Sequence, residues 1–210
     1  MLFYICNWGY ELAWTWAPRL SNVWRSTPDV GDPGHAEWER ILRTFDQNAF
    51  HAVSGGPNHW SDPDMLEVGV PGLNGVEEQS VFSLWAISAA PLWAGNDLTA
   101  MSSETLRILT HREIIAVDQD SLGQPATLVL EEQPGLQVWA RRLAGSDSPQ
   151  AVLLFNRTAL KATMRIEWEN LGIYGAAEVH DLWLRRDLGV LTVSVRPNAW
   201  TRSLWPRWQE

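Results

Sequence analysis

Hydrophobic and polar residues follow two different patterns along this chain, and the change falls near residue 123. Before it, apolar residues recur at helical spacing over residues 36–48, which predicts a helix. Further helices are predicted over residues 76–90, a stretch that is largely apolar in its second half and ends at Pro91, from residue 102 or 103, where a Ser can cap the helix, to residue 109, and over residues 113–117. Short apolar runs at 2–5, 52–54 and 92–94 predict strands. Alternation of strands and helices is typical of βα units around a parallel sheet.

After Gln124 and Pro125 the chain consists of short runs rich in branched and aromatic residues. The runs are 127–130, 137–140, 151–155, 164–168, 178–182, 190–195 and 199–205. Turn-forming residues such as Pro134-Gly135 separate them. About seven short strands with turns between them are typical of an antiparallel sandwich. We therefore predict an α/β domain over residues 1–123 and an antiparallel β-sandwich over residues 124–210.

Charge narrows the class of partner. The chain has 25 acidic and 16 basic residues and a net charge of −9. A protein that neutralises phosphates needs a basic surface, so nucleic acid is an unsuitable partner. The basic residues form no block that would hold an anionic membrane, and no run approaches the roughly 18 apolar residues of a bilayer span. A neutral, hydroxyl-rich ligand fits this charge better, and the 14 Trp supply flat surfaces for sugars as well as core volume.

Metal and disulfide chemistry have little support. Cys6 is the single cysteine, so it has no partner within the chain, and the five His show no zinc-ligand spacing. We predict no metal and no cofactor. The apolar start of the chain is short and lacks a basic head, so it is not predicted to be a signal peptide. We expect the true N-terminus to lie upstream, and the sequence assigns no localisation.

Carboxylates gather in two segments of the first region, residues 24–32 and 59–67. Pro63 separates Asp62 from Asp64 and restricts the backbone on both sides. Side chains at the carboxyl ends of barrel strands line active sites, and a pair of carboxylates is what glycoside hydrolysis requires. Asp is also a common turn and cap residue, and this structural role is the more frequent one. Spacing alone leaves both interpretations of Asp29 and Asp64 open.

Six ordered segments resemble the alpha-galactosidases of glycoside hydrolase family 27. They are Cys6-Asn7-Trp8-Gly9, Asn22-Val23-Trp24-Arg25, residues 60–69 (WSDPDMLEVG), Phe82-Ser83-Leu84-Trp85-Ala86, Ala90-Pro91-Leu92, and residues 115–123 (IAVDQDSLG). The resemblance implies a partial TIM (β/α)8 barrel, about strands five to eight, followed by an antiparallel β-sandwich.

The resemblance also implies roles for single residues. Asp29 is similar to the family's acid/base carboxylate. The sugar-binding positions of the family correspond to Asn7, Trp8, Arg25, Asp64 and Met65. Asn7 stands where many members have a Glu, and Ser61 replaces the usual Asn. The implied substrate is a galactose-terminated oligosaccharide or glycoconjugate.

The family's nucleophile is an Asp in a Lys-Tyr/Phe-Asp-x-Cys motif, and the 210 residues contain no such motif. In the family, its Cys pairs with the cysteine that Cys6 matches. We therefore expect this chain to be the C-terminal half of a retaining alpha-galactosidase and to be inactive alone. Three alternatives stay open: an alpha-N-acetylgalactosaminidase, a non-catalytic sugar-binding module, and a remnant without function. Members of the family are mostly secreted or lysosomal, and whether this chain forms a dimer is left open.

Overall fold

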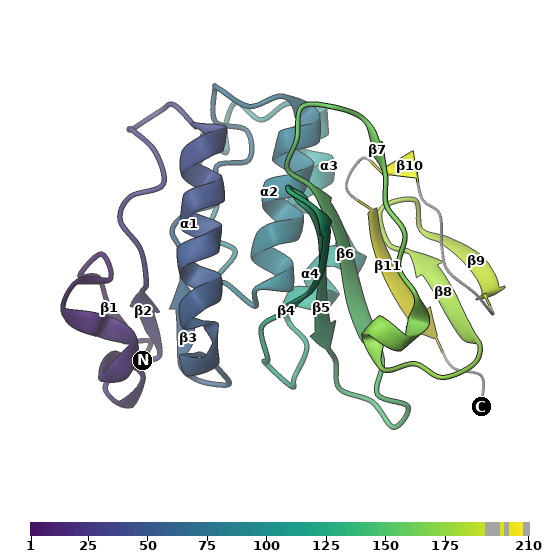
Figure 1. Cartoon of the computed structure of the whole chain (residues 1–210). Coiled ribbons are helices and arrows are strands. Elements are labelled where there is room, and N and C mark those ends of the chain that lie inside the picture. The colour runs from purple at the N-terminus through teal and green to yellow at the C-terminus, as the bar shows by residue number, and fades with distance from the viewer. Residues whose placement is uncertain (192–197, 200–201, 208–210) are drawn as a thin grey trace. The chain divides into compact units, whose positions relative to one another are not determined.

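The structure is a computed structural model that describes residues 1–191, 198–199 and 202–207. The chain divides into two compact units, residues 1–125 and residues 126–210. Figure 1 shows helices and short strands in the first unit and longer strands in the second. The fold class predicted from the sequence, a partial α/β barrel and an all-β region, is confirmed by these elements.

The first unit contains a parallel sheet of three short strands. Its order is β1 (Tyr4–Ile5), β2 (Val23–Arg25) and β3 (Trp60–Asp62). In the register of β2 and β3, Arg25 lies opposite Asp62. The segment that follows β3 continues the parallel arrangement through an isolated bridge between Leu66 and Ala94. Within the described part of the chain, the other edge of β1 pairs with no strand.

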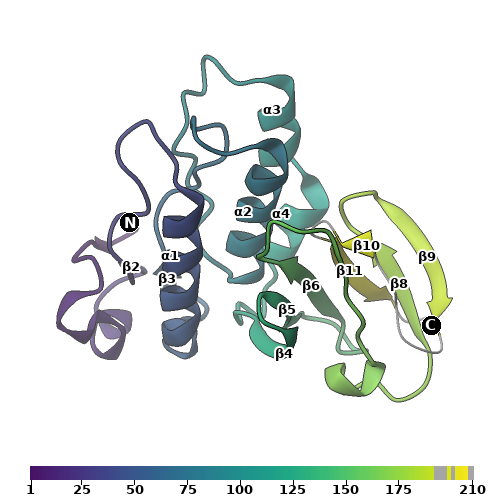
Figure 2. The same ribbon diagram turned by 45° about the horizontal axis from the view of Figure 1, so that its top comes forward.

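Four α-helices follow the strands, as predicted. They are α1 (Trp38–His51), α2 (Gly75–Ile87), α3 (Ser103–Leu109) and α4 (Arg112–Asp118). Figure 2 shows α1 and α2 side by side, with α3 and α4 beyond α2. The side chain of Asn74 accepts the backbone N–H groups of Val76 and Glu77 and so caps α2, while Ser102 caps α3. The described helices include none with the length and apolar character needed to span a membrane.

Two of the predicted strands in the first unit were wrong. Residues 52–54 form a 3-10 helix, η3 (Ala52–Ser54), that directly follows α1. Residues 92–94 contribute only the isolated bridge at Ala94. Two further 3-10 helices, η1 (Tyr10–Thr15) and η2 (Ala17–Arg19), connect β1 to β2. The sequence pattern missed β2 and β3 because each is three residues long and includes buried polar side chains, which an apolar-run criterion does not detect.

The second unit is an antiparallel structure. One sheet has the order β4-β5-β6-β11-β8-β9, and β7 pairs with β10. The strands are β4 (Thr127–Gln133), β5 (Leu136–Arg142), β6 (Gln150–Asn156), β7 (Ala162–Thr163), β8 (Ala177–Asp181), β9 (Arg186–Leu191), β10 (Asn198–Ala199) and β11 (Arg202–Arg207). Alternate residues of β5 and β6 are buried in one apolar cluster, and η4 (Trp168–Leu171) adds to it. A layer packed on the sheet agrees with the predicted sandwich.

One predicted strand run in this unit is wrong. Residues 164–168 are not a strand, because β7 ends at Thr163 and η4 begins at Trp168. Met164 and Ile166 are buried in the apolar cluster from the segment between β7 and η4, so the apolar character of the run reflects burial and not a strand. Predicted runs 190–195 and 199–205 fall partly outside the described residues, and the described part of the first belongs to the end of β9.

Candidate active site

All six predicted site residues lie at the carboxyl ends of the three parallel strands. Asn7 and Trp8 follow β1, Arg25 is the last residue of β2, and Asp29 lies in the loop after it. Asp64 and Met65 follow β3. Carboxyl ends of parallel strands meet at one edge of a sheet, which is where barrel enzymes place their active sites. The short strands therefore carry residues distant in sequence to a common edge.

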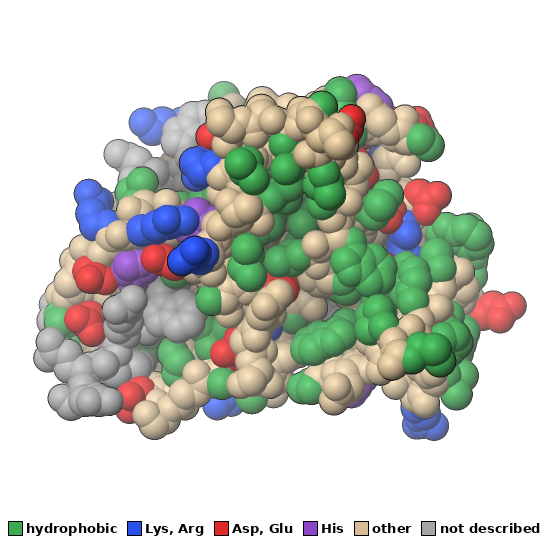
Figure 3. Space-filling model, turned by 180° about the vertical axis from the view of Figure 1, so that it is seen from behind, with side chains coloured by type: hydrophobic (Ala, Val, Ile, Leu, Met, Phe, Trp, Pro, Cys, Tyr) green, Lys and Arg blue, Asp and Glu red, His purple; other side chains and the backbone are tan. Residues whose placement is uncertain are grey.

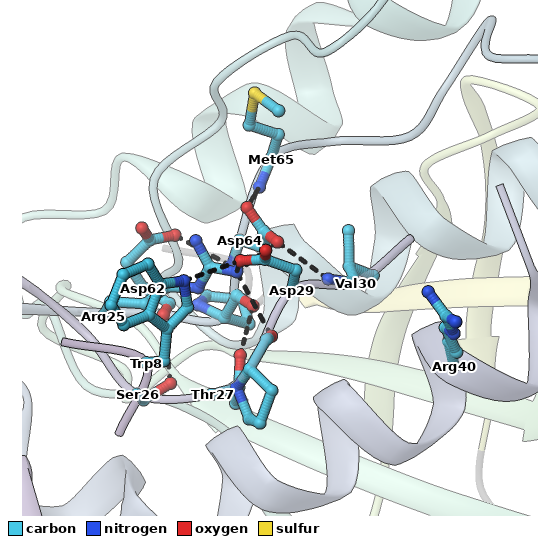
Figure 4. A network of polar contacts seen from close by, with 12 residues as sticks. Trp8, Arg25, Ser26, Thr27, Asp29, Val30, Arg40, Asp62, Asp64 and Met65 are labelled. Carbon is cyan, nitrogen blue, oxygen red and sulfur yellow. Dashed lines mark hydrogen bonds and ion pairs between the residues drawn. The ribbon is translucent and has the colours of Figure 1, made fainter. Parts of the chain in front are cut away.

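Arg25 joins the two acidic segments. Its Nη2 donates to Asp29 Oδ1 at 3.0 Å and also contacts Asp64 Oδ2. The side chain of Arg25 is buried, with 5% of the residue exposed, and Asp64 is buried as well, so the ion pair with Asp64 is shielded from water, whereas the pair with Asp29 is open to solvent on the Asp29 side. Figure 4 shows the guanidinium of Arg25 close to both carboxylates. Asp29 and Asp64 thus belong to one polar site.

Asp29 faces solvent within this site. Its side chain is 66% exposed, and Oδ1 accepts hydrogen bonds from Arg25 and from Trp8 Nε1 at 2.9 Å. No partner of its Oδ2 occurs among the described residues. One carboxylate oxygen is held in place while the other is open to a ligand. This arrangement suits transfer of a proton to or from a bound molecule.

Asp64 is the buried member of the pair. Its Oδ2 accepts the backbone N–H of Val30 at 2.8 Å, and its Oδ1 accepts the N–H of Met65 at 2.7 Å. The backbone carbonyl of Asp64 accepts the indole N–H of Trp85 at 2.8 Å. Its φ angle is 136°, in a region that residues with a side chain rarely adopt. Such a conformation persists only where the surroundings hold it, and it is common at ligand sites.

Arg25 and the acidic residues near it shift one another's pKa values. Burial lowers the pKa of Arg25, but the charges of Asp64 and Asp62 outweigh it, so the pKa is raised and the guanidinium stays charged. Burial raises the pKa of the Asp62 carboxyl, against hydrogen bonds from Tyr4 and the charge of Arg25. Nearby, burial and then the charge of Asp64 raise the pKa of Glu67 to about 7. The site is therefore a cluster of acidic groups around one cation.

Among the described residues, the side chains of Asn7 and Met65 have no polar contact with Arg25, Asp29 or Asp64. Asn7 Nδ2 donates to the carbonyl of Tyr10 at 2.7 Å, which folds the side chain back onto the η1 turn. Met65 joins the network through its backbone N–H, and Figure 4 shows its side chain pointing away from Arg25. The substrate contacts of Asn7 and Met65 stay predictions.

Sequence reasoning missed four contributors to the site. Tyr4, Asp62, Trp85 and the backbone N–H of Val30 all hold the acidic residues. Tyr4 lies in an apolar run and Trp85 in an apolar helix, so neither has a polar sequence signal. Asp62 could have been found from its place in the Asp-Pro-Asp motif.

A cleft of about 510 Å³ lies at the opposite ends of the strands. Val23 and Trp60, which begin β2 and β3, line it together with Trp93. Arg25, Asp29 and Asp64 are not among its lining residues. The largely apolar cleft is therefore separate from the acidic site. Across the described residues, no three His, Cys, Asp or Glu side chains are grouped to hold a metal ion.

Known proteins resemble both units. Residues 2–120 match the family described as Alpha galactosidase A, and residues 133–201 match the Alpha galactosidase C-terminal beta sandwich domain. The alpha-galactosidase of Oryza sativa subsp. japonica is 41% identical over 203 residues, which cover 94% of this chain and 47% of that protein. Alpha-galactosidase 2 of Arabidopsis thaliana is 40% identical over 185 residues, which cover 87% of this chain and 45% of that protein.

Among solved structures, alpha-galactosidase I from Mortierella vinacea has a TM-score of 0.86 to this chain at 28% identity. The match covers 98% of this chain and 58% of the Mortierella chain. This chain spans about half the length of the curated relatives that it matches.

Proposed function

We propose that this chain, which belongs to the alpha-galactosidase family, supplies the acid/base and sugar-binding residues of a retaining alpha-galactosidase site. The observation that carries the proposal is the position of Arg25 between Asp29 and Asp64. It brings an open carboxylate and a buried one to the same strand ends. The proposed substrates are galactose-terminated oligosaccharides or glycoconjugates.

Asp29 is the proposed acid/base. Retaining hydrolysis needs a carboxylic acid that protonates the departing glycosidic oxygen and later takes a proton from water. Oδ1 of Asp29 is oriented by Trp8 and Arg25, and Oδ2 is available to carry the proton. Trp8 also presents part of its ring to solvent, with 46% of the residue exposed. An exposed indole beside the acid gives a sugar ring an apolar surface to lie on.

Asp64 and Arg25 are the proposed binders of sugar hydroxyls. A carboxylate has about four acceptor sites, so Asp64 keeps acceptor capacity beyond its contacts with Val30, Met65 and Arg25. Held by the buried residues Val30 and Arg25, it is a rigid acceptor whose position differs little between free and bound protein. Rigid polar groups of this kind give a sugar site its orientation and specificity.

The covalent step needs a second carboxylate that attacks the sugar carbon. The resemblance places this nucleophile in a Lys-Tyr/Phe-Asp-x-Cys motif, and the single Lys of this sequence, Lys161, is followed by Ala162. These 210 residues therefore supply the acid/base half of the chemistry and not the nucleophile. We propose that they do not hydrolyse alpha-galactosides without a partner segment that carries it.

A chimera tests this division of roles. The segment of the rice alpha-galactosidase that this chain does not match would be joined in front of it, and hydrolysis of nitrophenyl alpha-galactoside measured. We expect no turnover by the chain alone and measurable turnover by the chimera. Hydrolysis by the chain alone that survives Asp29→Asn would contradict both the missing nucleophile and the choice of acid.

Substrates with different leaving groups show whether Asp29 is a catalytic acid or a structural residue. In the chimera, Asp29→Asn should reduce hydrolysis of raffinose by about 10²–10⁴-fold, because an alkoxide leaves poorly without a proton. The loss in kcat/KM should be much smaller for a dinitrophenyl galactoside, whose phenolate leaves unaided in the first step. Equal losses with both substrates would show that Asp29 has another role.

Sugar binding without catalysis is the second candidate, and the observation that favours it is a complete Trp8–Arg25–Asp29–Asp64 network in a sequence without the nucleophile motif. Calorimetry of the chain with galactose and with N-acetylgalactosamine tests it. We expect binding of galactose that weakens on Asp64→Asn. Preference for N-acetylgalactosamine would favour the alpha-N-acetylgalactosaminidase alternative, and no heat at millimolar sugar would contradict the binding role.

A further inference from the structure

Asp62 is a buried carboxylate to which the proposed function gives no role. Only 1% of the residue is exposed, so it cannot contact a sugar in this arrangement. Its Oδ2 accepts the hydroxyl of Tyr4 at 2.7 Å, and its Oδ1 accepts the backbone N–H of Asp64 at 3.0 Å. The two oxygens thus join a residue of β1 to the segment after β3. A buried carboxylate with two directed donors is held in one orientation.

The N–H that Asp62 accepts belongs to the strained residue of the site. Asp64 has a φ angle of 136°, and its backbone is held at both ends, by Asp62 at the N–H and by Trp85 at the carbonyl. Its carboxylate direction depends on this backbone conformation. Releasing the N–H would let Asp64 move toward a common conformation and turn its carboxylate away from Val30 and Arg25.

Tyr4 completes the arrangement from the neighbouring strand. Burial and the charge of Asp62 raise the pKa of Tyr4, so its hydroxyl keeps its proton and donates to Asp62. The ring of Tyr4 is fixed in turn by an edge contact with Trp93, with ring centroids 5.1 Å apart. Figure 4 shows Asp62, Arg25 and Asp64 in one continuous network.

We infer that Tyr4 and Asp62 are positioning residues for the sugar-binding carboxylate: Tyr4 orients Asp62, and Asp62 holds the backbone of Asp64 in the conformation that aims its carboxylate at the sugar. Neither residue touches the ligand. The inference rests on the proposed sugar-binding role of Asp64 and deepens it.

Galactose affinity of the full 210-residue chain tests the inference. Tyr4→Phe removes only the hydroxyl and should weaken galactose binding about two- to tenfold, the value of one buried hydrogen bond. Asp62→Asn, which removes a charged acceptor, should weaken it about tenfold or more. Tyr10→Phe is the matched control, because Tyr10 is exposed and bonds to Asn7 through its backbone N–H and carbonyl, which the substitution keeps. It should bind as the unsubstituted chain does.

A double-substitution cycle separates positioning from general loss of structure. If Tyr4 acts through Asp64, then Tyr4→Phe should cause no further loss of affinity in an Asp64→Asn background. Hydrogen exchange of the Asp64 amide is the direct readout: it should be faster in Tyr4→Phe, whereas amides of β5 and β6 should keep their rates.

The outcomes distinguish this inference from the proposed function. Unchanged exchange at the Asp64 amide in Tyr4→Phe and Asp62→Asn would overturn the inference. So would additive losses in the cycle, or an unchanged affinity in both variants. If the unsubstituted chain binds no galactose, the proposed function fails instead, and the exchange rates still decide whether Tyr4 and Asp62 hold Asp64.

Discussion

The strands of the two units have different roles: those of the first position polar groups, and those of the second form an apolar core. In the first unit, β2 and β3 have three residues each, and half of these residues are buried polar side chains: Arg25, Ser61 and Asp62. In the second unit, β5 and β6 have seven residues each and place alternate side chains in an apolar cluster. Short strands that end in buried charge bring functional groups together, whereas long strands with an apolar face stabilise a sheet.

The two units also differ in how many of their strands have an edge without a partner strand. At the start of the first unit, three large apolar residues that precede β1 are exposed, Met1, Leu2 and Phe3, and one edge of β1 pairs with no strand of the described residues. Seen from behind in Figure 3, apolar side chains cover much of the side of the molecule that carries β1 to β3. In the second unit, the order β4-β5-β6-β11-β8-β9 gives most strands a partner on both sides. An open strand edge such as that of β1 favours pairing with other chains.

Removing the central cation should have the largest effect on stability. Arg25→Met leaves Asp64 and Asp62 buried without their counter-ion, which we expect to cost about 3–5 kcal/mol in free energy of unfolding. Urea denaturation measures it. The matched control is Arg40→Met, which breaks the solvent-exposed pairs of Arg40 with Asp32 and Glu37 and should have a much smaller effect. Equal losses in the two variants would show that burial of the Arg25 network contributes little.

An apolar truncation makes the corresponding change in the second unit. Leu154 lies in β6, is fully buried and belongs to the apolar cluster, so Leu154→Ala should cost about 2–5 kcal/mol. Leu160→Ala removes a side chain that is 77% exposed and should change stability by less than about 0.5 kcal/mol. Hydrogen exchange of the β5 and β6 amides reports the loss locally. Unchanged protection in Leu154→Ala would contradict an apolar origin of stability in this sheet.

This contrast explains which elements the sequence could predict. The helices α1 to α4 were predicted because their signals are local: apolar spacing in α1, a long apolar stretch ended by Pro91 in α2, and a Ser cap at the start of α3, which α4 follows. The strands β5, β6 and β8 were predicted because their runs are long enough to show a pattern. The strands β2 and β3 were missed because three residues with buried polar groups carry no strand signal. Residues 164–168 misled because Met164 and Ile166 enter the apolar cluster from a segment outside any strand, and η4 begins only at Trp168.

The site was predictable only in part for a related reason. Two clusters of carboxylates and the resemblance identified Arg25, Asp29 and Asp64, which the structure brings together. The groups that hold them are Tyr4, Trp85 and a backbone N–H, none of which differs in sequence from ordinary core residues. Positive φ at Asp64 likewise arises from its surroundings rather than from its residue type.

The buried acid Glu67 makes the first unit sensitive to pH. Its pKa is raised from 4.5 to about 7 by burial and by Asp64, so the folded state holds its proton over a range where the unfolded state has lost it. Stability from this group is therefore fully present below about pH 4.5 and is lost as pH rises to 7. Glu67→Gln should be more stable than the unsubstituted chain by about 1–3 kcal/mol at pH 8 and equally stable at pH 4.5.

Thermal unfolding at the two pH values measures the difference between the Glu67 variant and the unsubstituted chain. The exposed Glu39 provides the control, since Glu39→Gln should show the same small change at both pH values. A Glu67→Gln variant with no added stability at pH 8 would mean that the carboxyl ionises freely in the folded state.

The smallest expected effect comes from a feature that the first unit shares with ordinary helical proteins. Asn74 caps α2 by accepting two backbone N–H groups, and Glu77 returns a contact to the N–H of Asn74. Asn74→Ala removes the acceptor and should cost about 1 kcal/mol in urea denaturation. Asn74→Asp keeps an acceptor and adds a negative charge at the helix N-terminus, so it should cost nothing. If Asn74→Ala is as stable as the unsubstituted chain, the capping contact contributes nothing, and α2 is held by the burial of its residues 80–87 alone.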